Sequence, residues 1–313
     1  MGNSRARTRD ANNGLSAGRQ AGRNVKIPPL QLQLKNVNEI ELNRRFPRSS
    51  RYNFEWIKEG AMGSNVLWMT EWLCEQLDLR PGMRILDLGC GKAKSSVFLA
   101  REFGVEVWAT DLWIAATENW QRIRDAGLEN QVYPLHCDAR ALPFAADFFD
   151  AIVALDCYPY FGTDDLYLNY LIQFVKPGGP VAIAGAGIVE ELPSPVPEHL
   201  REFWTQGAWA LHSVAWWRRH WERTGLVEIS TSDTMEDGWK LWSQWQREAW
   251  PHNTVEIETL DKDAGRFLTY VRLVAHRCAG VALEEYVWPD TMRSMPSSYE
   301  KKPMLRRTDS DAD

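Results

Sequence analysis

Two glycines and an acidic residue form the most chemically informative stretch of the chain. An apolar run that starts at Met83 carries Asp87 near its end, Gly89 and Gly91 follow, and a helix-compatible segment, 95–103, comes next. Glycine lets a backbone close onto a ligand, and the free N–H groups at a helix N-terminus attract an anionic or carboxylate-bearing cofactor. This order predicts a strand, a tight turn and a helix that together bind a cofactor.

A second acidic residue ends the next predicted strand. Residues 105–111 are rich in β-branched and aromatic side chains and end in Asp111. A carboxylate at this place can accept hydrogen bonds from the two hydroxyls of a ribose, in nicotinamide-binding and methyl-donor folds alike. Leu112 and Trp113 follow and are candidates for contact with an adenine ring, and an ordinary core position is the alternative for Trp113.

The sequence Asp87-Leu88-Gly89-Cys90-Gly91 resembles the first motif of the class I S-adenosylmethionine-dependent methyltransferases. The resemblance implies that Asp87 steers the amino-acid end of the cofactor and that the glycine turn passes against it. The third small residue of the family motif is glycine. Here it is Ala93, whose methyl group we expect to fit at a negative φ angle. A dinucleotide-binding fold would have a third glycine where this chain has Lys94.

The same resemblance extends to the third and fourth predicted strands. Asp138 resembles the residue that accepts a hydrogen bond from the adenine amino group, with the N–H of Ala139 beside a ring nitrogen; a turn residue before Pro143 is the alternative for Asp138. Asp156 stands at the tip of a predicted strand, where ligands bind in doubly wound sheets. The predicted residues for binding S-adenosyl-L-methionine are Asp87, Gly89, Cys90, Gly91, Asp111, Leu112, Asp138, Ala139 and Asp156.

Strands and helices alternate along most of the chain, which favours a mostly parallel sheet covered on both faces. By resemblance we expect a doubly wound α/β fold with seven strands in the order 3-2-1-4-5-7-6 and an antiparallel last strand. Residues 31–60 show no clean period and predict an irregular arm. Helices are predicted at 64–77 with Ser64 as N-cap, 95–103, 115–126 and 164–174, and strands at 105–111, 132–135, 149–155, 180–184, 226–231 and 268–275.

One methyltransferase domain, 31–278, is predicted between a basic tail, 1–30, and a second tail, 279–313, both expected to be disordered. Within the domain, 185–225 is a lid-like insert rich in proline and then in tryptophan. Ser213 is the expected N-cap of a helix that carries Trp216, Trp217 and Trp221, and a further helix at 238–250 carries Trp239, Trp242 and Trp245. Tryptophans at helical spacing form either core or an aromatic pocket wall.

Few residues are candidates for acid–base chemistry. The methyl group of the predicted cofactor is already activated, so an enzyme has to exclude water, align the acceptor and remove a proton where the acceptor carries one. Tyr158, Tyr160 and His212 are the candidate catalytic residues, each with packing as its alternative. No metal-ligand spacing is seen. A tryptophan wall favours aromatic, apolar or cationic small-molecule acceptors.

Composition limits the partners and the compartment. The chain of 313 residues has a net charge of −6, and residues 1–26 carry +5 of it, which leaves about −11 on the remainder. An acidic body argues against nucleic acid as a partner, because such surfaces cluster basic charge. No apolar run is long enough to span a membrane, and five cysteines without ligand spacing favour a reducing compartment. We expect a cytoplasmic protein, with a mitochondrial location as the alternative from the arginine-rich start; oligomeric state is not indicated.

The sequence therefore predicts an S-adenosylmethionine-dependent methyltransferase that acts on a small-molecule acceptor by in-line transfer. It resembles the ubiquinone- and menaquinone-biosynthesis type and the cyclopropane-fatty-acid-synthase-like group. An NAD-dependent oxidoreductase is opposed by Lys94 and Asp138, and an RNA or protein methyltransferase by the acidic body. Nothing in the sequence opposes a non-catalytic cofactor-binding scaffold.

Overall fold

A seven-stranded sheet forms the centre of the molecule, in a computed structural model that describes residues 37–281 and 283. The strand order is β3-β2-β1-β4-β5-β7-β6, as predicted. The first five strands are parallel, and β7 runs antiparallel to both β5 and β6. The predicted tail at 1–30 and most of the one at 279–313 lie outside the described residues. The strands are β1 (Arg84–Leu88), β2 (Glu106–Asp111), β3 (Val132–His136), β4 (Ala151–Leu155), β5 (Pro180–Ile188), β6 (Val227–Thr234) and β7 (Leu268–Arg277).

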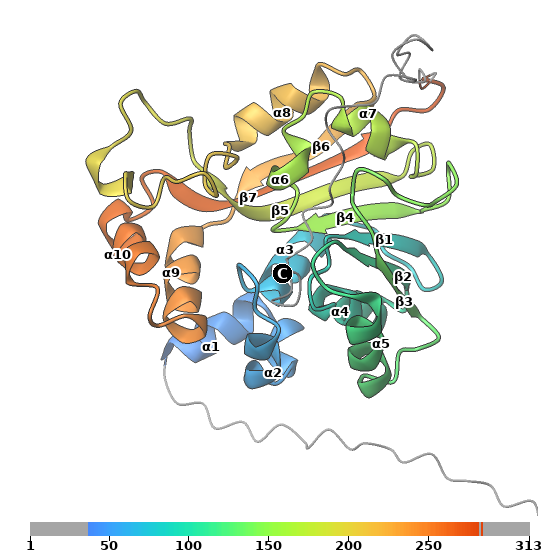
Figure 1. Cartoon of the computed structure of the whole chain (residues 1–313), viewed down its shortest axis with the longest axis horizontal. Coiled ribbons are helices and arrows are strands. Elements are labelled where there is room, and N and C mark those ends of the chain that lie inside the picture. Colours follow the sequence, from blue (N-terminus) through green and yellow to red (C-terminus); the bar gives the residue numbers. More distant parts are fainter. Residues whose placement is uncertain (1–36, 282, 284–313) are drawn as a thin grey trace, which may run out of the picture.

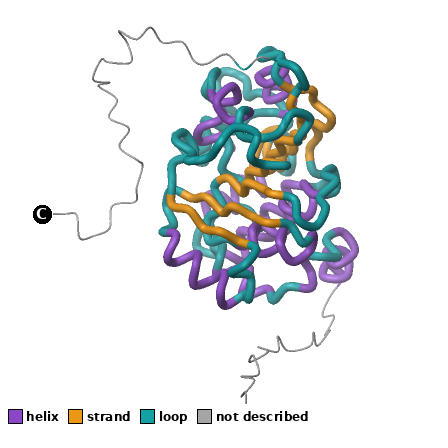
Figure 2. The backbone as a smooth tube through the Cα atoms, turned by 90° about the vertical axis from the view of Figure 1, so that its right-hand side faces the viewer, coloured by secondary structure: helices purple, strands orange, loops and turns teal. Residues whose placement is uncertain are grey.

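Helices cover both faces of this sheet (Figures 1 and 2). One face packs against α3 (Val66–Cys74), α4 (Lys94–Phe103) and α5 (Ala116–Asp125), and the other against α6 (Pro159–Gly162), α7 (Tyr167–Ile172) and α8 (Val214–Glu222). Two further helices, α9 (Gly238–Ala249) and α10 (Thr254–Asp263), stand together at the β6–β7 end. Within residues 37–281, no helix is long and apolar enough to cross a lipid bilayer.

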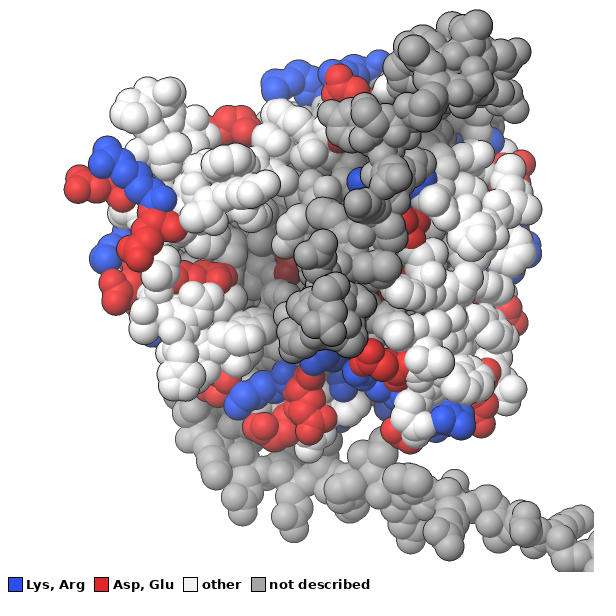
Figure 3. All heavy atoms as spheres, in the orientation of Figure 1, with Lys and Arg blue, Asp and Glu red and all other residues white. Residues whose placement is uncertain are grey.

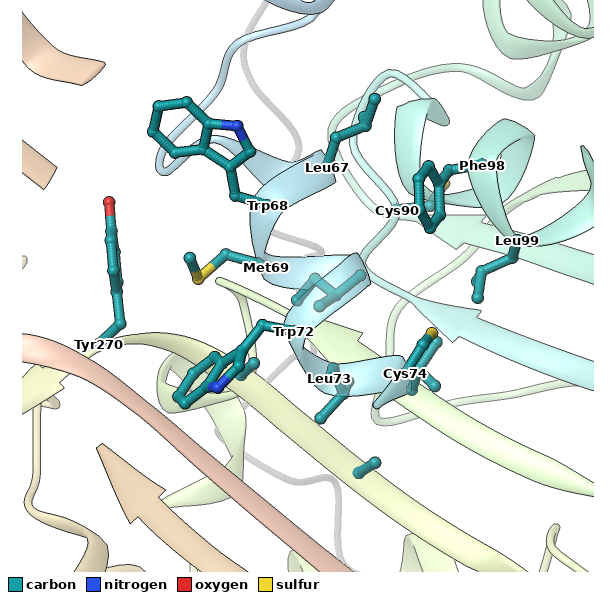
Figure 4. Packing of buried hydrophobic residues seen from close by; sticks show 14 of the residues in the cluster. Leu67, Trp68, Met69, Trp72, Leu73, Cys74, Cys90, Phe98, Leu99 and Tyr270 are labelled. Atoms are coloured by element: carbon teal, nitrogen blue, oxygen red, sulfur yellow. The ribbon is translucent and has the colours of Figure 1, made fainter. Parts of the chain in front are cut away.

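The helix α3 is buried all round rather than on one side (Figure 4). Eight of its nine side chains are buried, including Glu71, whose carboxylate accepts hydrogen bonds from the backbone N–H groups of Arg48 (2.8 Å) and Ser49 (2.6 Å). Ser64 is not its cap. Asn65 is, because its side-chain oxygen accepts from the backbone N–H groups of the first turn at 3.2 and 3.3 Å. The N-terminal end of α3 therefore places 61–64 beside the strand tips.

Four helices differ from expectation. The segment expected to be irregular contains α1 (Val37–Arg45) and α2 (Phe54–Glu59), and neither the short α6 nor α10 was predicted. The side chain of Asn53 caps α2 by accepting from the backbone N–H of Trp56 at 2.9 Å, and Phe46 stacks on Trp68 with ring centroids 5.5 Å apart. These helices are short, so tertiary contacts decide them rather than a periodic pattern.

The fifth strand is longer than predicted. It continues past Ala184 to Ile188, because its last residues pair with β7, as in Ala186 with Tyr270 and Ile188 with Leu268. Ser213 caps α8 as expected, and its hydroxyl accepts from the backbone N–H of Trp216 at 3.2 Å. The insert therefore begins later than 185 and returns to the carboxyl end of β5, where Ser213 bridges Ile188.

Candidate functional site

The turn after β1 has a backbone conformation that favours glycine at two positions. Gly89 and Gly91 have φ angles of 71° and 53°. A Cβ on Gly89 would lie 2.6 Å from the Cys157 sulfur, and one on Gly91 would lie 2.9 Å from the Met62 sulfur. Both positions need glycine for their backbone conformation, and Gly89 needs it also for space, because Cys157 is too short a side chain to move away.

Ala93 corrects one expectation. Its φ angle is 57°, in the left-handed region, instead of negative. Its methyl group is fully buried in the core beside α4. Alanine therefore stands at a position that retains glycine's backbone conformation, and burial of one methyl group offsets part of the strain.

Asp87 lines neither of the two cavities beside the turn, and its role at the cofactor stays a prediction. Its side chain is fully buried, and one carboxylate oxygen accepts hydrogen bonds from the hydroxyls of Ser95 and Ser96, both at 2.6 Å. Burial raises the pKa of Asp87 to about 6, and the two hydroxyls lower it only in part. The Asp87 carboxylate lies behind the glycine turn, because its hydrogen-bond donors, Ser95 and Ser96, are in the first turn of α4.

Asp111 holds the turn and the next loop together. One carboxylate oxygen accepts from the backbone N–H of Gly91 at 2.7 Å, and the other from those of Trp113 (2.7 Å) and Ile114 (2.9 Å). A carboxylate oxygen can accept two hydrogen bonds. The Asp111 oxygen that accepts from the N–H of Gly91 therefore keeps one position for a ligand hydroxyl. Asp111 also lines a cavity at the carboxyl ends of the strands.

The smaller cavity, of about 170 Å³, lies at the carboxyl ends of β1, β2 and β4. We call it the glycine-turn cavity. Tyr160, Lys94 and Arg140 also face it, and the sequence pattern indicated neither Lys94 nor Arg140. Eight of the nine predicted cofactor positions line it: Gly89, Cys90, Gly91, Asp111, Leu112, Asp138, Ala139 and Asp156.

Three basic residues of the described chain line this cavity, Lys92, Lys94 and Arg140. The guanidinium of Arg140 pairs with both carboxylate oxygens of Asp138, with Nε at 2.9 Å and Nη2 at 2.6 Å from them. The ammonium of Lys94 lies 3.7 Å from the ring centre of Trp56, and burial lowers the pKa of Lys94 to about 8. The spacing Asp-x-Arg after the third strand is the signal that could have pointed to Arg140.

A larger cavity, of about 1040 Å³, adjoins the first and lies between the insert and the α9–α10 pair. We call it the aromatic cavity. Figure 3 shows a recess in this face with acidic atoms inside it. The titratable carboxylates on its lining are Asp156, Glu202 and Glu256, against Lys92 as the cation among its described residues. Its aromatic lining consists of Trp113, Tyr160, Phe203, Trp242 and Trp250.

Asp156 stands where the two cavities meet. Its φ angle is 57°, and its carboxylate accepts hydrogen bonds from the backbone N–H groups of Ser64 (2.7 Å) and Ala186 (2.9 Å). A Cβ on Gly63 would lie 2.3 Å from the carboxylate. Strained backbone of this kind persists only where neighbours fix it, and it clusters at functional sites.

The three predicted catalytic residues lie in different surroundings. Tyr160 lines both cavities, 57% exposed, and burial of its hydroxyl end raises its pKa. Tyr158 lines neither, because it is buried in the core with Trp217 and Trp221 packed edge-on against its ring. His212 also lines neither. Its ring stacks on Trp216 at 3.7 Å and its Nδ1 lies 3.0 Å from a carboxylate oxygen of Glu191.

The tryptophans that line the cavities do not come from the insert. Trp242 and Trp245 belong to α9, Trp250 follows it, and Trp113 follows β2. The tryptophans of α8 pack on the opposite face of the sheet. The insert contributes other residues to the aromatic cavity, among them Glu202, Phe203, Thr205, Ala208 and Leu211. Among the described residues, no group of three or more side chains has the arrangement of a metal site.

Comparison with known proteins assigns part of the chain. Residues 85–179 match the family model described as "Methyltransferase domain". These residues form a methyltransferase domain. This domain is 37% identical over 117 residues to "Methyltransferase GfsG" of Streptomyces halstedii, which covers 37% of this chain and 42% of that protein. The chain spans about half or less of the length of the first curated relatives it matches.

Solved structures share the fold of the methyltransferase domain. Phosphoethanolamine N-methyltransferase 2 of Haemonchus contortus superposes with a TM-score of 0.60 at 20% identity, over 76% of this chain and 59% of that one. The [4+2]-cyclase SpnF superposes with a TM-score of 0.54 at 17% identity, over 71% of this chain and 85% of that one. One fold therefore carries different reactions, so the activity has to be argued from the site.

Proposed function

We propose that this domain transfers the methyl group of S-adenosyl-L-methionine to a bulky, largely apolar small-molecule acceptor. The observation that carries the proposal is the meeting of two cavities at Met62, Asp156 and Tyr160, which line both. One cavity has the glycine turn and the acidic strand tips of a nucleoside site. The other is large and aromatic, as expected for an apolar acceptor.

The glycine-turn cavity fits the cofactor in its chemistry. The turn has no Cβ at Gly89 or Gly91, Asp111 keeps an acceptor position for a ribose hydroxyl, and Leu112 and Ala139 offer apolar contact. Its 170 Å³ is below the range of roughly 300–1,000 Å³ that is usual for ligand sites. Met62, whose sulfur packs over Gly91 and which is 40% exposed, is the side chain whose displacement would enlarge it.

The residues at the junction have the roles that methyl transfer requires. When bound, S-adenosylmethionine supplies a methyl group that is already activated on a sulfonium centre. Trp113 and the segment 61–64 border the junction, where they would limit the access of water to a bound acceptor. Asp156 positions this segment through its bond to Ser64, and the hydroxyl of Tyr160 can orient the accepting atom by a hydrogen bond.

The aromatic cavity disfavours a phosphorylated acceptor. Three carboxylates face one lysine among its described lining residues, and the Lys92 ammonium already donates to the Glu59 carbonyl oxygen at 3.0 Å. A phosphate would meet repulsion there. The domain therefore differs in acceptor class from the phosphoethanolamine enzymes whose fold it shares. The predictions of no nucleic-acid partner and of a cytoplasmic location stay predictions.

Mass spectrometry tests the activity. A metabolite or natural-product extract is incubated with the protein and S-adenosylmethionine carrying a labelled methyl group. We expect labelled, apolar, non-phosphorylated products and a matching amount of S-adenosylhomocysteine. Cofactor that binds without being consumed in any extract would favour a scaffold or a cyclase-like reaction. Tighter binding of NAD than of S-adenosylhomocysteine in calorimetry would contradict the cofactor assignment itself.

A further inference from the structure

The inner wall of the aromatic cavity is formed by the junction of α9 and α10. Glu256, in the first turn of α10, lines it. One carboxylate oxygen of Glu256 accepts from Nε1 of Trp242 and the other from Nδ2 of Asn253, both at 2.7 Å. Trp242 is itself stacked on Tyr270 at 5.5 Å. The carboxylate is therefore held in one orientation, and each oxygen retains an acceptor position.

The charge around Glu256 is unfavourable for a second anion and favourable for a cation. Burial raises the pKa of Glu256, and the negative charge of Asp156 raises it further. Glu202 lines the same cavity. Lys92, the lysine on the lining of this cavity, already donates a hydrogen bond to a backbone carbonyl oxygen. A positive charge inside the cavity would stabilise the ionised form of Glu256.

An independent observation points to a hydrogen-bond donor at the same wall. Gln246 lies one helical turn after Trp242, lines the cavity and is 4% exposed. Its side-chain oxygen is buried and has no hydrogen-bond partner among the described residues. A buried acceptor without a donor costs stability, and an N–H group of a ligand in the cavity could supply that donor. The ring of Trp250, which also lines the cavity, offers a cation–π contact.

We propose that the acceptor carries a protonated amine, which binds at this wall between Glu256 and Gln246, and that Glu256 determines specificity for it. The inference rests on the proposed function, because it takes the aromatic cavity as the acceptor site. An ammonium group matches the fixed carboxylate and supplies the donor that Gln246 lacks. The apolar remainder of the acceptor packs against the aromatic lining.

Calorimetry with a matched pair of probes tests the amine site. Naphthylethylamine and its neutral isostere naphthylethanol are titrated into the full chain at about pH 8, with and without saturating S-adenosylhomocysteine. We expect the amine to bind about tenfold more tightly than the alcohol, the gain of one charge-assisted hydrogen bond. In Glu256→Gln this preference should fall to near one while the alcohol binds as before, which also shows that the variant is folded.

Glu258→Gln is the control, because Glu258 lies on the same helix but is exposed, pairs with Lys262 and does not line the aromatic cavity. It should retain the preference for the amine. Equal binding of the two probes by the parent protein, or a preference that survives in Glu256→Gln, would overturn the amine site. Failure of S-adenosylhomocysteine to bind would instead contradict the proposed function, and the amine preference can still be measured without it.

Discussion

Asp111 and Asp156 hold backbone segments in place while they face the cavities. Asp111 accepts hydrogen bonds from three backbone N–H groups and Asp156 from two, and in each case they join segments far apart in the sequence. A sequence pattern can show an acid at a strand tip. It cannot show these backbone donors, since they depend on loops of irregular conformation. A substitution at either residue should therefore affect both ligand binding and the fold.

Asp111→Ala tests this double role. The variant leaves the N–H groups of Gly91, Trp113 and Ile114 without their acceptor, so the free energy of unfolding should fall by about 1–3 kcal/mol. Affinity for S-adenosylhomocysteine should fall at least tenfold, because the ribose loses its acceptor and the turn loses its support. Denaturant unfolding and calorimetry measure the two effects. Unchanged affinity would show that the ribose binds elsewhere.

At the scale of secondary structure, the central sheet was the most predictable part. Buried parallel strands appear as continuous apolar runs between turns, so β1 to β4 were found within a few residues. Because topology fixes where parallel strands end, eight predicted cofactor positions also reached one cavity. Side-chain direction is not fixed in that way. Tyr158 and Tyr160 are two residues apart, yet one is buried in the core and the other faces the cavities.

Helical periodicity predicted that tryptophans share one face of a helix. It did not predict which part of the molecule that face packs against. The α8 tryptophans pack on the sheet, whereas Trp242 and Trp245 of α9 reach the cavities although both are almost fully buried. The helix α10 has mixed polarity and is held by contacts with α9, such as the bond between Glu256 and Trp242. No sequence pattern therefore predicted that residues of α10, such as Glu256, would line the site.

The two ends of the insert contact each other directly. Ile188 and Ser213 form a β-bridge, and Glu191 accepts hydrogen bonds from the backbone N–H and the hydroxyl of Ser213, both at 2.9 Å. A short glycine–serine linker in place of 192–210 would keep these contacts. We expect affinity for S-adenosylhomocysteine to change less than about threefold, because the glycine-turn cavity has no lining residue in that segment.

Acceptor methylation by the same variant should be lost, since Phe203, Thr205 and Ala208 would no longer line the aromatic cavity. Leu200 is fully buried, so some loss of stability is expected and unfolding should be measured alongside. The lid prediction fails if cofactor affinity collapses together with activity. Retained activity would place the acceptor outside the aromatic cavity.

At the scale of the whole molecule, ionisable groups behind the turn link stability to pH. Burial raises the pKa of Asp87 from an ordinary value of 3.8 to about 6. The folded protein therefore binds more protons than the unfolded chain between these values, and the Asp87 contribution to stability is complete below 3.8 and is lost as the pH rises to about 6. Lys94, whose pKa falls to about 8, acts in a separate and more alkaline window.

Asp87→Asn should remove this pH dependence. Because the side chain is fully buried, the shift corresponds to at most about 3 kcal/mol. The free energy of unfolding of the variant minus that of the parent should therefore increase by up to this amount between about pH 4 and pH 7, whatever its value at either end. Denaturant unfolding across this range measures the difference.

Ser95→Ala is the informative control, because loss of a hydroxyl that lowers the pKa of Asp87 should move the transition to higher pH. A difference that stays constant with pH would show that Asp87 is not the group that titrates.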